Sequence, residues 1–279
     1  LTLTLLSPEE AHGVAVDVYR QLVAEGILEV SAQELLTRTD GVLATEHGED
    51  ASRRFRVWNR FLQSGRPLFV LLGGATGVGK STVASELALR LDVVRIQSTD
   101  MLREVMRLLT TERLLPCLFR STYDAWEAVT DTCPGRQPEQ GRLVQGFMNQ
   151  AKSVEVAVGS VLSRGATERL SLIVEGIHLH PAYLSELSRH DDAIVVPAVL
   201  GLLKKKELRA RLKGRSVEAP SRRAERYLEH IEEIWQLQDF FLSEADRYRI
   251  PIVENDNRDN ALRQLLEQVS TALTAEFAD

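Results

Sequence analysis

The sequence predicts an α/β protein in which a five-stranded parallel sheet carries helices on both faces, preceded by a small helical domain. From Pro67 onward, short apolar runs alternate with helical periods, a pattern typical of parallel strands that are buried on both faces. A complete glycine-rich phosphate-binding pattern joins the first of these runs to a helix. Residues 8–63 read as helical, so we expect a helical domain over 1–64 and a second domain over 65–279.

Composition excludes several classes of protein. A chain of 279 residues with 44% hydrophobic and 27% charged residues is typical of a globular protein, and its net charge of -6 argues against a nucleic-acid binder. No apolar run approaches the roughly 18–20 residues that cross a membrane, and the start "LTLTLLSPEE" lacks the Met and the basic region of a signal peptide. Cys117 and Cys133 belong to no CxxC pair, which favours a reduced, cytoplasmic protein without structural zinc. We expect a monomer or a homodimer.

Three helices are predicted in the first domain. The segment 7–26 opens with Ser-Pro-Glu-Glu and ends on a glycine, which are start and stop signals of a helix. In the segment 31–47, Ser31 is followed three residues later by Glu34, so we expect a capping box there. A third helix is expected over 50–65.

Five strands are predicted in the second domain. Each is a short apolar run followed by a helical or basic segment, and the runs are "PLFVLLG", "VVRIQST", "RLSLIVEG", "DAIVVPAVLGL" and "RIPIVEND".

The stretch "GGATGVGKST" after the first strand matches G-x-x-x-x-G-K-[ST] without a mismatch. Its glycines allow backbone N–H groups to converge on phosphate oxygens, and the following helix points its positive end at the same anion. We expect Lys80 to reach the β- and γ-phosphates of ATP and Ser81 to bind Mg²⁺. The sequence thus predicts a P-loop kinase fold whose ATP contacts come from Gly74, Thr76, Gly77, Val78, Gly79, Lys80, Ser81 and Thr82.

The second strand leads into "STDMLREVMRLL", where Asp100, Arg103 and Arg107 share one face of a helix. Ligands bind at the carboxyl ends of strands in such sheets, so Asp100 is predicted to accept the hydroxyl proton of the acceptor or to hold the Mg²⁺ water shell. The alternative is that Asp100 is the N-cap of the helix. For the two arginines, the alternatives are substrate binding and a solvated helix face.

The third strand ends in Glu175, and a mostly apolar run followed by an acid resembles a Walker B strand, whose carboxylate orients the Mg²⁺ water. The alternative is a surface acid at a strand end. His178 and His180 follow, either in contact with substrate or hydrogen-bonded behind it.

The segment 204–226 holds ten Lys or Arg against three Glu, a net charge of +7 in a chain of -6. Such a concentration favours a lid, around 203–226, that closes on phosphates, with Arg211 and Arg215 on the transferred group and Arg222 or Arg226 on an anionic substrate. The alternative is a patch that contacts RNA. Beyond the last strand, Asn255 and Asn257 either contact adenine or form an Asx-turn.

Taken in order, the segments "GGATGVGKST", "STDMLREVMR", "STYDAW", "GFMNQA", "LIVEGIHLHP" and "RYLEHIEEIWQLQDFFLSEA" ahead of "IPIVEND" resemble the 2-phosphoglycerate kinase family. The resemblance spans nearly the whole chain. It implies ATP-dependent phosphorylation of the 3-hydroxyl of 2-phosphoglycerate, giving 2,3-bisphosphoglycerate. It also implies an acceptor pocket lined by Ser121, Thr122, Tyr123 and Trp126, with Gly146 and Gln150 nearby, although Tyr123 and Trp126 could equally be core residues.

Residues 8–63 resemble the helical part of the ATP-cone-like domain that precedes the kinase in this family, without the basic hairpin of ATP cones. Three functions remain in competition: this kinase, a P-loop kinase of another phosphorylated metabolite or of a sugar nucleotide as in zeta-type toxins, and a non-catalytic ATP-dependent regulator. Asp100 favours the kinases, because a regulator needs no carboxylate beside the acceptor.

Overall fold

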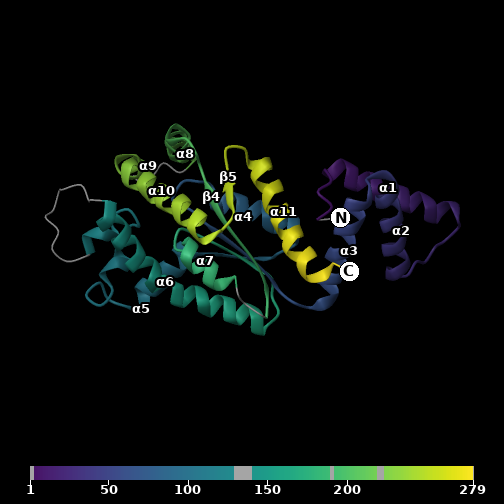
Figure 1. The fold of residues 1–279 in the computed structure, drawn as a ribbon, viewed down its shortest axis with the longest axis horizontal. Coiled ribbons are helices and arrows are strands. Elements are labelled where there is room, and N and C mark those ends of the chain that lie inside the picture. The colour runs from purple at the N-terminus through teal and green to yellow at the C-terminus, as the bar shows by residue number, and fades with distance from the viewer. Residues whose placement is uncertain (1–2, 129–139, 189–191, 219–222, 279) are drawn as a thin grey trace. The chain divides into compact units, whose positions relative to one another are not determined.

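The computed structural model describes residues 3–128, 140–188, 192–218 and 223–278 (Figure 1). The chain divides into two compact units, one formed by Leu1–Arg66 with Arg263–Asp279 and the other by Pro67–Leu262. The sequence predicts 263–279 to belong to the second domain, whereas the structure groups these residues with the helical unit.

The first unit contains the three predicted helices, α1 (Pro8–Ala24), α2 (Ala32–Glu46) and α3 (Glu49–Ser64). Their shared core is apolar and consists of Val14, Val18, Val42, Leu43, Ala51 and Phe55. A reciprocal capping box forms at Ser7 and Glu10 of α1. The box expected at Ser31 is only half formed: Ser31 Oγ accepts from the Glu34 backbone, but the Glu34 carboxylate pairs with Arg38 instead.

The second unit is built on a parallel sheet with strand order β2-β3-β1-β4-β5, and all five predicted strands are confirmed. Apolar β1 lies in the middle and is buried at every position, whereas β2 is an edge strand with exposed residues. The strands are β1 (Leu68–Gly73), β2 (Arg95–Ser98), β3 (Leu172–Glu175), β4 (Ile194–Gly201) and β5 (Ile252–Glu254).

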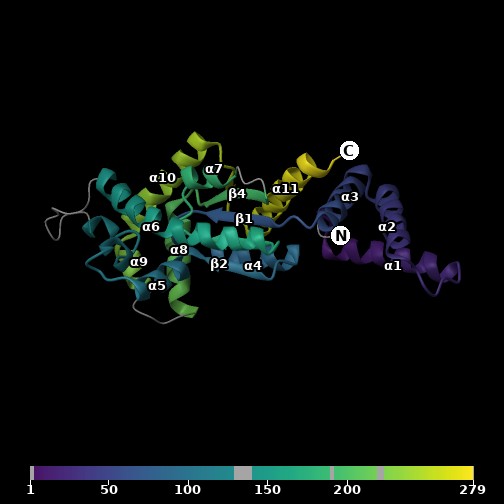
Figure 2. The same cartoon turned by 90° about the horizontal axis from the view of Figure 1, so that it is seen from below.

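Helices cover the sheet on both faces (Figures 1 and 2). α4 contacts β1, β2 and β3, whereas α7 and α10 contact β4. The remaining elements are α4 (Lys80–Leu91), α5 (Thr99–Leu109), η1 (Pro116–Phe119), η2 (Ala125–Ala128), α6 (Gln140–Thr167), α7 (Pro181–Leu187), α8 (Lys205–Glu218), α9 (Arg223–Glu229), α10 (Ile231–Tyr248) and α11 (Arg258–Phe277).

The topology brings the predicted site residues together at one edge of the sheet. The phosphate loop follows β1, Asp100 lies just beyond β2, Glu175 ends β3 and Asn255 follows β5. Because the strands are parallel, their carboxyl ends meet at this edge, which is where ligands bind in open α/β sheets.

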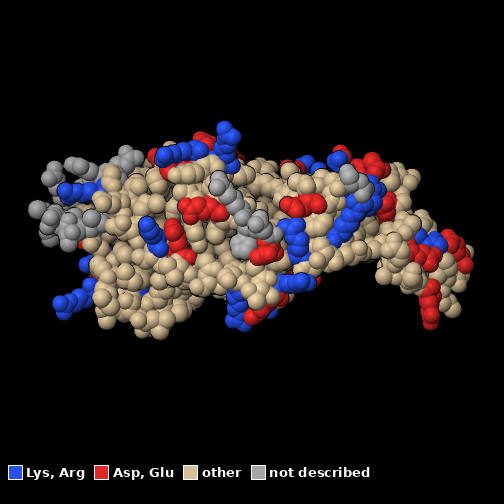
Figure 3. Space-filling model, turned by 60° about the horizontal axis from the view of Figure 1, so that its bottom comes forward, with Lys and Arg blue, Asp and Glu red and all other residues tan. Residues whose placement is uncertain are grey.

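The charged surface is mixed. On the face shown in Figure 3, basic and acidic side chains lie interspersed rather than in separate fields. Within the described ranges, no helix combines the length and the apolar character that crossing a membrane requires.

Candidate active site

The phosphate loop has the backbone that the motif predicts. Gly74, Gly77 and Gly79 have φ values of 139°, 88° and 94°, a region that side-chain-bearing residues rarely adopt. A Cβ on Gly74 would lie 2.3 Å from the Leu200 carbonyl oxygen, so this position also lacks room for a side chain. Lys80 Nζ donates a hydrogen bond to the Ala75 carbonyl at 2.8 Å, inside the loop.

Arg211 and Asn255 support this loop from outside. Both donate to the Val78 carbonyl, at 3.0 and 2.8 Å, and Arg211 also donates to the Asn255 carbonyl. Burial lowers the pKa of Arg211 from its ordinary value. The described contacts of Arg211 therefore tie α8 to the loop backbone, and it is not among the residues that line the cavity described below.

The two predicted metal ligands lie side by side. Ser81 Oγ donates to Glu175 Oε1 at 2.9 Å, and Glu175 is buried. A hydroxyl and a carboxylate are hard oxygen donors that suit Mg²⁺, so these two side chains fit the predicted ion.

A cavity of about 120 Å³ opens beside the phosphate loop. The loop, α5, the 121–123 segment, the end of β3 and α9 all contribute to its wall. The lining residues are Thr76, Gly77, Gly79, Lys80, Ser81, Asp100, Arg103, Ser121, Thr122, Tyr123, Glu175, Ile177 and Tyr227.

Asp100 and Arg103 form the wall of the cavity on α5. Asp100 lies in the first turn and is 64% exposed, while the N-cap position belongs to Ser98, so the alternative of Asp100 as N-cap is wrong. Arg103 is only 14% exposed and donates to the Arg120 carbonyl at 2.7 Å. Its Nε is buried and has no hydrogen-bond partner among the described residues.

The structure does not bring Arg107 to the cavity. Its guanidinium donates to both carboxylate oxygens of Glu104 at 2.9 Å and lies 5.0 Å from the centre of the Phe119 ring. Arg107 does lie on the same face of α5 as Asp100, as the helical spacing predicts. It is one turn beyond Arg103, however, and therefore lies past the cavity wall.

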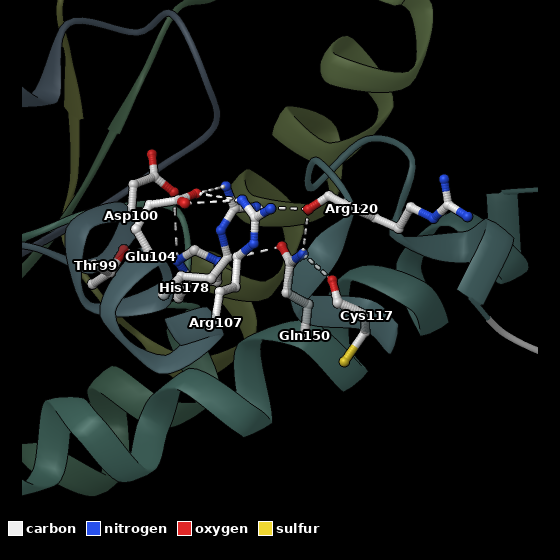
Figure 4. A network of polar contacts seen from close by, with 9 residues as sticks. Thr99, Asp100, Glu104, Arg107, Cys117, Arg120, Gln150 and His178 are labelled. Atoms are coloured by element: carbon white, nitrogen blue, oxygen red, sulfur yellow. Dashed lines mark hydrogen bonds and ion pairs between the residues drawn. The ribbon is translucent and has the colours of Figure 1, made fainter. Parts of the chain in front are cut away.

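His178 and Gln150 are buried and are not among the residues that line the cavity. Figure 4 shows both of them in a network of polar contacts that includes Thr99 and Arg120. His178 is fully buried, and its Nδ1 lies 2.8 Å from Thr99 Oγ while its Nε2 lies 3.3 Å from Gln150 Oε1. Burial lowers the pKa of His178 to about 4; the Asp100 carboxylate opposes this shift, and Arg103 and Lys80 add to it. His178 is therefore neutral near pH 7, and its contacts fit the predicted alternative of a hydrogen-bonded supporting role.

Two further predicted residues have structural partners. His180 is the N-cap of α7 and contacts Glu155 at 2.8 Å through Nε2. Asn257 Oδ1 accepts from the backbone of Asp259 and Asn260 at 2.9 and 3.1 Å, which is the Asx-turn alternative.

Of the predicted lid, Arg222 lies outside the described residues, as does the side chain of Arg215. The helices α8 and α9 flank the undescribed residues. Arg226 of α9 donates to Asp124 Oδ2 at 2.7 Å, and Tyr227 lines the cavity.

Sequence reasoning missed Ile177 and Tyr227 as cavity residues and Asp124 as the buried partner of Arg226. Tyr227 precedes an amphipathic helix, and a pattern of apolar residues cannot separate a ring in the core from a ring at a cavity. Trp126 is buried, as the core alternative has it, whereas Tyr123 is both buried and part of the cavity wall.

Comparisons with known proteins agree on the family. The 2-phosphoglycerate kinase of Pyrococcus furiosus is 34% identical over 259 residues, which are 93% of this chain and 82% of that protein. The 2-phosphoglycerate kinase of Methanopyrus kandleri is 33% identical over 277 residues, 98% of this chain and 82% of that protein. No family model matches the chain.

Among solved structures, a gluconokinase from Sinorhizobium meliloti covers 76% of this chain and 94% of its own, at 15% identity and a TM-score of 0.41, a likeness too distant to carry an argument. The curated relatives are similar over nearly the whole chain, and the phosphate loop and the cavity lie within that range. The chain therefore belongs to the 2-phosphoglycerate kinase family, and it is a kinase that transfers a phosphoryl group to a hydroxyl group.

Proposed function

We propose that the protein transfers the γ-phosphoryl group of ATP to the 3-hydroxyl of 2-phosphoglycerate, giving 2,3-bisphosphoglycerate and ADP. One observation carries the proposal: the phosphate loop, the Asp100 carboxylate and the Arg103 guanidinium face the same cavity. Donor phosphate, base and acceptor anion can then meet there without a large rearrangement of the described residues. The names of the curated relatives support the choice of acceptor.

The nucleotide end is formed by the phosphate loop. Its N–H groups and Lys80 bind the β- and γ-phosphates, and Lys80 exchanges its present bond to the Ala75 carbonyl for the phosphate oxygens. Ser81 and Glu175 hold Mg²⁺, which neutralises charge on the phosphates. The lid around 203–226 is proposed to close over these phosphates, with Arg211 as its described anchor on the loop.

Asp100 acts as the base. Its carboxylate accepts the proton of the acceptor hydroxyl as that oxygen bonds to the γ-phosphorus, and the bond from this phosphorus to the bridging oxygen of ADP breaks. The neighbouring Thr99 hydroxyl does not compete for the Asp100 carboxylate, because it is engaged with His178.

The acceptor anion is bound by Arg103 with the hydroxyls of Ser121 and Thr122. ATP with Mg²⁺ carries a net charge near -2, which Lys80 and one lid arginine balance. Arg103 then exchanges its contact with Glu104 for the phosphate or carboxylate of the acceptor, because guanidinium binds such groups with paired hydrogen bonds.

The first test ranks acceptors by ADP release. Turnover of 2-phosphoglycerate should far exceed that of glycerate, because glycerate lacks the phosphate that Arg103 pairs. Equal rates for the two acids, or a faster reaction with a phosphorylated sugar or a sugar nucleotide, would reject this acceptor. If no acceptor stimulates ADP formation in a single turnover, the protein is a regulator and not this kinase.

A second test addresses the base. Asp100→Asn should lower kcat about 10²-fold or more, because the amide cannot take the proton, while the KM for ATP changes little. Asp92→Asn is the matched control, since Asp92 is an exposed residue in a left-handed conformation that asparagine tolerates. Equal kcat in the two variants would remove Asp100 from the mechanism.

A third test compares two arginines on one helix. Arg103→Gln should raise the KM for the acceptor about tenfold or more and leave the KM for ATP nearly unchanged. Arg107→Gln removes the same charge one turn further on, from a side chain that pairs with the same Glu104 but does not line the cavity. If both substitutions raise the KM for the acceptor equally, the positive charge of this region would matter, and direct contact between Arg103 and the acceptor would not.

A further inference from the structure

Gln150 of α6 has a fully buried side chain that does not line the cavity. Its Nε2 donates to two backbone carbonyls, those of Cys117 at 2.5 Å and Arg120 at 2.9 Å. Because both partners are acceptors, only the NH₂ end of the amide can face them. The orientation of the amide is thereby determined, and Oε1 must point to His178, 3.3 Å away.

This orientation selects the tautomer of His178. Oε1 is an acceptor, so His178 Nε2 must carry the proton that it donates. In the neutral ring Nδ1 is then an acceptor, and the Thr99 hydroxyl donates a hydrogen bond to it at 2.8 Å. The 3.8 Å approach between Nδ1 and Asp100 Oδ1 is thus not an ion pair, and Asp100 keeps its lone pairs for the cavity.

The same amide is linked to the anion-binding side of the cavity. The Arg120 carbonyl accepts from Gln150 Nε2 and also from Arg103, at 2.9 and 2.7 Å (Figure 4). Moving that carbonyl would move the guanidinium that donates to it. One buried amide therefore connects the segment 117–120 that anchors Arg103 with the histidine that anchors Thr99, the residue before Asp100.

The Thr99 end of this network has little freedom. A Cβ on Gly176 would lie 1.8 Å from Thr99 Oγ, so the turn after β3 packs directly on this hydroxyl. A displacement of the His178 ring therefore displaces Thr99 and the first turn of α5, because the described residues next to Thr99 leave no cavity that could accommodate the movement.

We propose that Gln150 is a positioning residue of the acceptor site, which sets the distance between Asp100 and Arg103 through its bonds to His178 and the Arg120 carbonyl, and which does not touch the substrate. The family resemblance implies only that Gln150 lies near the acceptor pocket, and the proposal gives it a defined role there. This role of Gln150 rests on the proposed function in one respect: Asp100 and Arg103 are taken to be residues of the acceptor site.

The test is a double-mutant cycle between Gln150→Met and Arg103→Gln, measured with the best acceptor of the screen above. Methionine keeps the length of the side chain but donates to neither carbonyl. Gln150→Met should raise the KM for the acceptor about tenfold and lower kcat, with the KM for ATP within about twofold of the parent. In the double variant, the acceptor KM should be about that of Arg103→Gln alone, because Gln150 acts through that arginine.

Ser153→Ala is the control on the same helix. Ser153 Oγ contacts Cys117 Sγ at 3.8 Å, so this change also removes a contact between α6 and η1, but one that reaches neither Arg103 nor His178. Its kinetic constants should stay within about twofold of the parent. The proposal would be overturned if the effects of Gln150→Met and Arg103→Gln on the acceptor KM multiply in the double variant, or if Ser153→Ala changes the kinetic constants as much as Gln150→Met does. Gln150 would then be a general packing residue.

A second measurement needs no variant at position 150. Long-range ¹H–¹⁵N correlation spectra of the parent protein, with His178→Gln to assign the signals, report which ring nitrogen is protonated. The Nε2–H tautomer is expected, and an Nδ1–H ring would overturn the proposal even if Gln150→Met does not fold. If another acceptor is turned over faster than 2-phosphoglycerate, the proposed function fails. The double-mutant cycle with that acceptor and the tautomer of His178 would still test the role of Gln150.

Discussion

His178 is a buried histidine whose neutral form is favoured near pH 7. The ring is fully buried, with its two nitrogens engaged by Thr99 and Gln150, and burial disfavours the charged form. Its pKa falls to about 4 from the ordinary 6.5, chiefly through burial. The adjacent Asp100 carboxylate counters this shift without reversing it.

This shift makes stability depend on pH with a definite sign. Between pH 6.5 and 4 the unfolded chain binds a proton at this histidine and the folded chain does not, so the free energy of unfolding rises with pH in this window. Stability is fully present above pH 6.5 and is lost as pH falls, with a change of about 2 kcal/mol between pH 7 and pH 5.

Denaturant unfolding at these two pH values checks the prediction. His178→Gln should lose this part of the pH dependence, whereas His12→Gln, at an exposed position, should keep it. Parallel pH profiles for the parent and His178→Gln would show that the buried ring does not contribute.

At the scale of elements, α6 depends on a close approach at Gly146. A Cβ there would lie 2.2 Å from the Trp126 backbone nitrogen, so η2 can pack on the helix only because no side chain intervenes. This contact places the 121–126 segment, and with it Ser121 and Thr122 at the cavity. The glycine of "GFMNQ" is thus needed for the approach of two elements and not for a turn.

Two glycines of α6 form a matched pair for a stability test. Gly146→Ala should destabilise the protein by about 2 kcal/mol, because a backbone has to move to admit the methyl group. Gly159→Ala places its Cβ 3.7 Å from the Tyr183 hydroxyl, an ordinary contact, and should stabilise the protein by about 0.5–1 kcal/mol through helix propensity. Thermal melting measures both, and a Gly146→Ala protein as stable as the parent would contradict the packing described here.

At the scale of the whole molecule, nucleotide binding should be visible as stability. A ligand that binds only the folded state at a hundred times its Kd adds about 2.7 kcal/mol, so ATP with Mg²⁺ should raise the Tm of the parent. Lys80→Ala should lose most of this shift at the same ATP concentration, together with several orders of magnitude in turnover. Asp100→Asn should keep the shift, because it is assigned to the acceptor.

A full ATP-dependent Tm shift in Lys80→Ala would contradict the assignment of the phosphate loop as the nucleotide site. Loss of the shift in Asp100→Asn would instead move that residue to the nucleotide or its metal ion. The two variants therefore separate ATP binding from phosphoryl transfer.

The sequence by itself determined the sheet, the phosphate loop and the carboxylates that follow two of its strands. These depend on local chemistry: apolar runs predict buried strands, and the glycines of the loop permit the one backbone that surrounds a phosphate. Asp100 and Glu175 could be predicted for the site because parallel strands bring their carboxyl ends to one edge.

Only the tertiary structure decided which arginine of α5 lines the cavity and which buried polar residues lie next to its wall. Arg103 and Arg107 look equivalent in the sequence and both contact Glu104, yet Arg103 lines the cavity whereas Arg107 packs on Phe119. Likewise, nothing local in the sequence shows that Gln150 meets His178 and the Arg120 carbonyl. Such contacts join residues that are dozens of positions apart, and a periodic pattern carries information only about neighbours along one helix or strand.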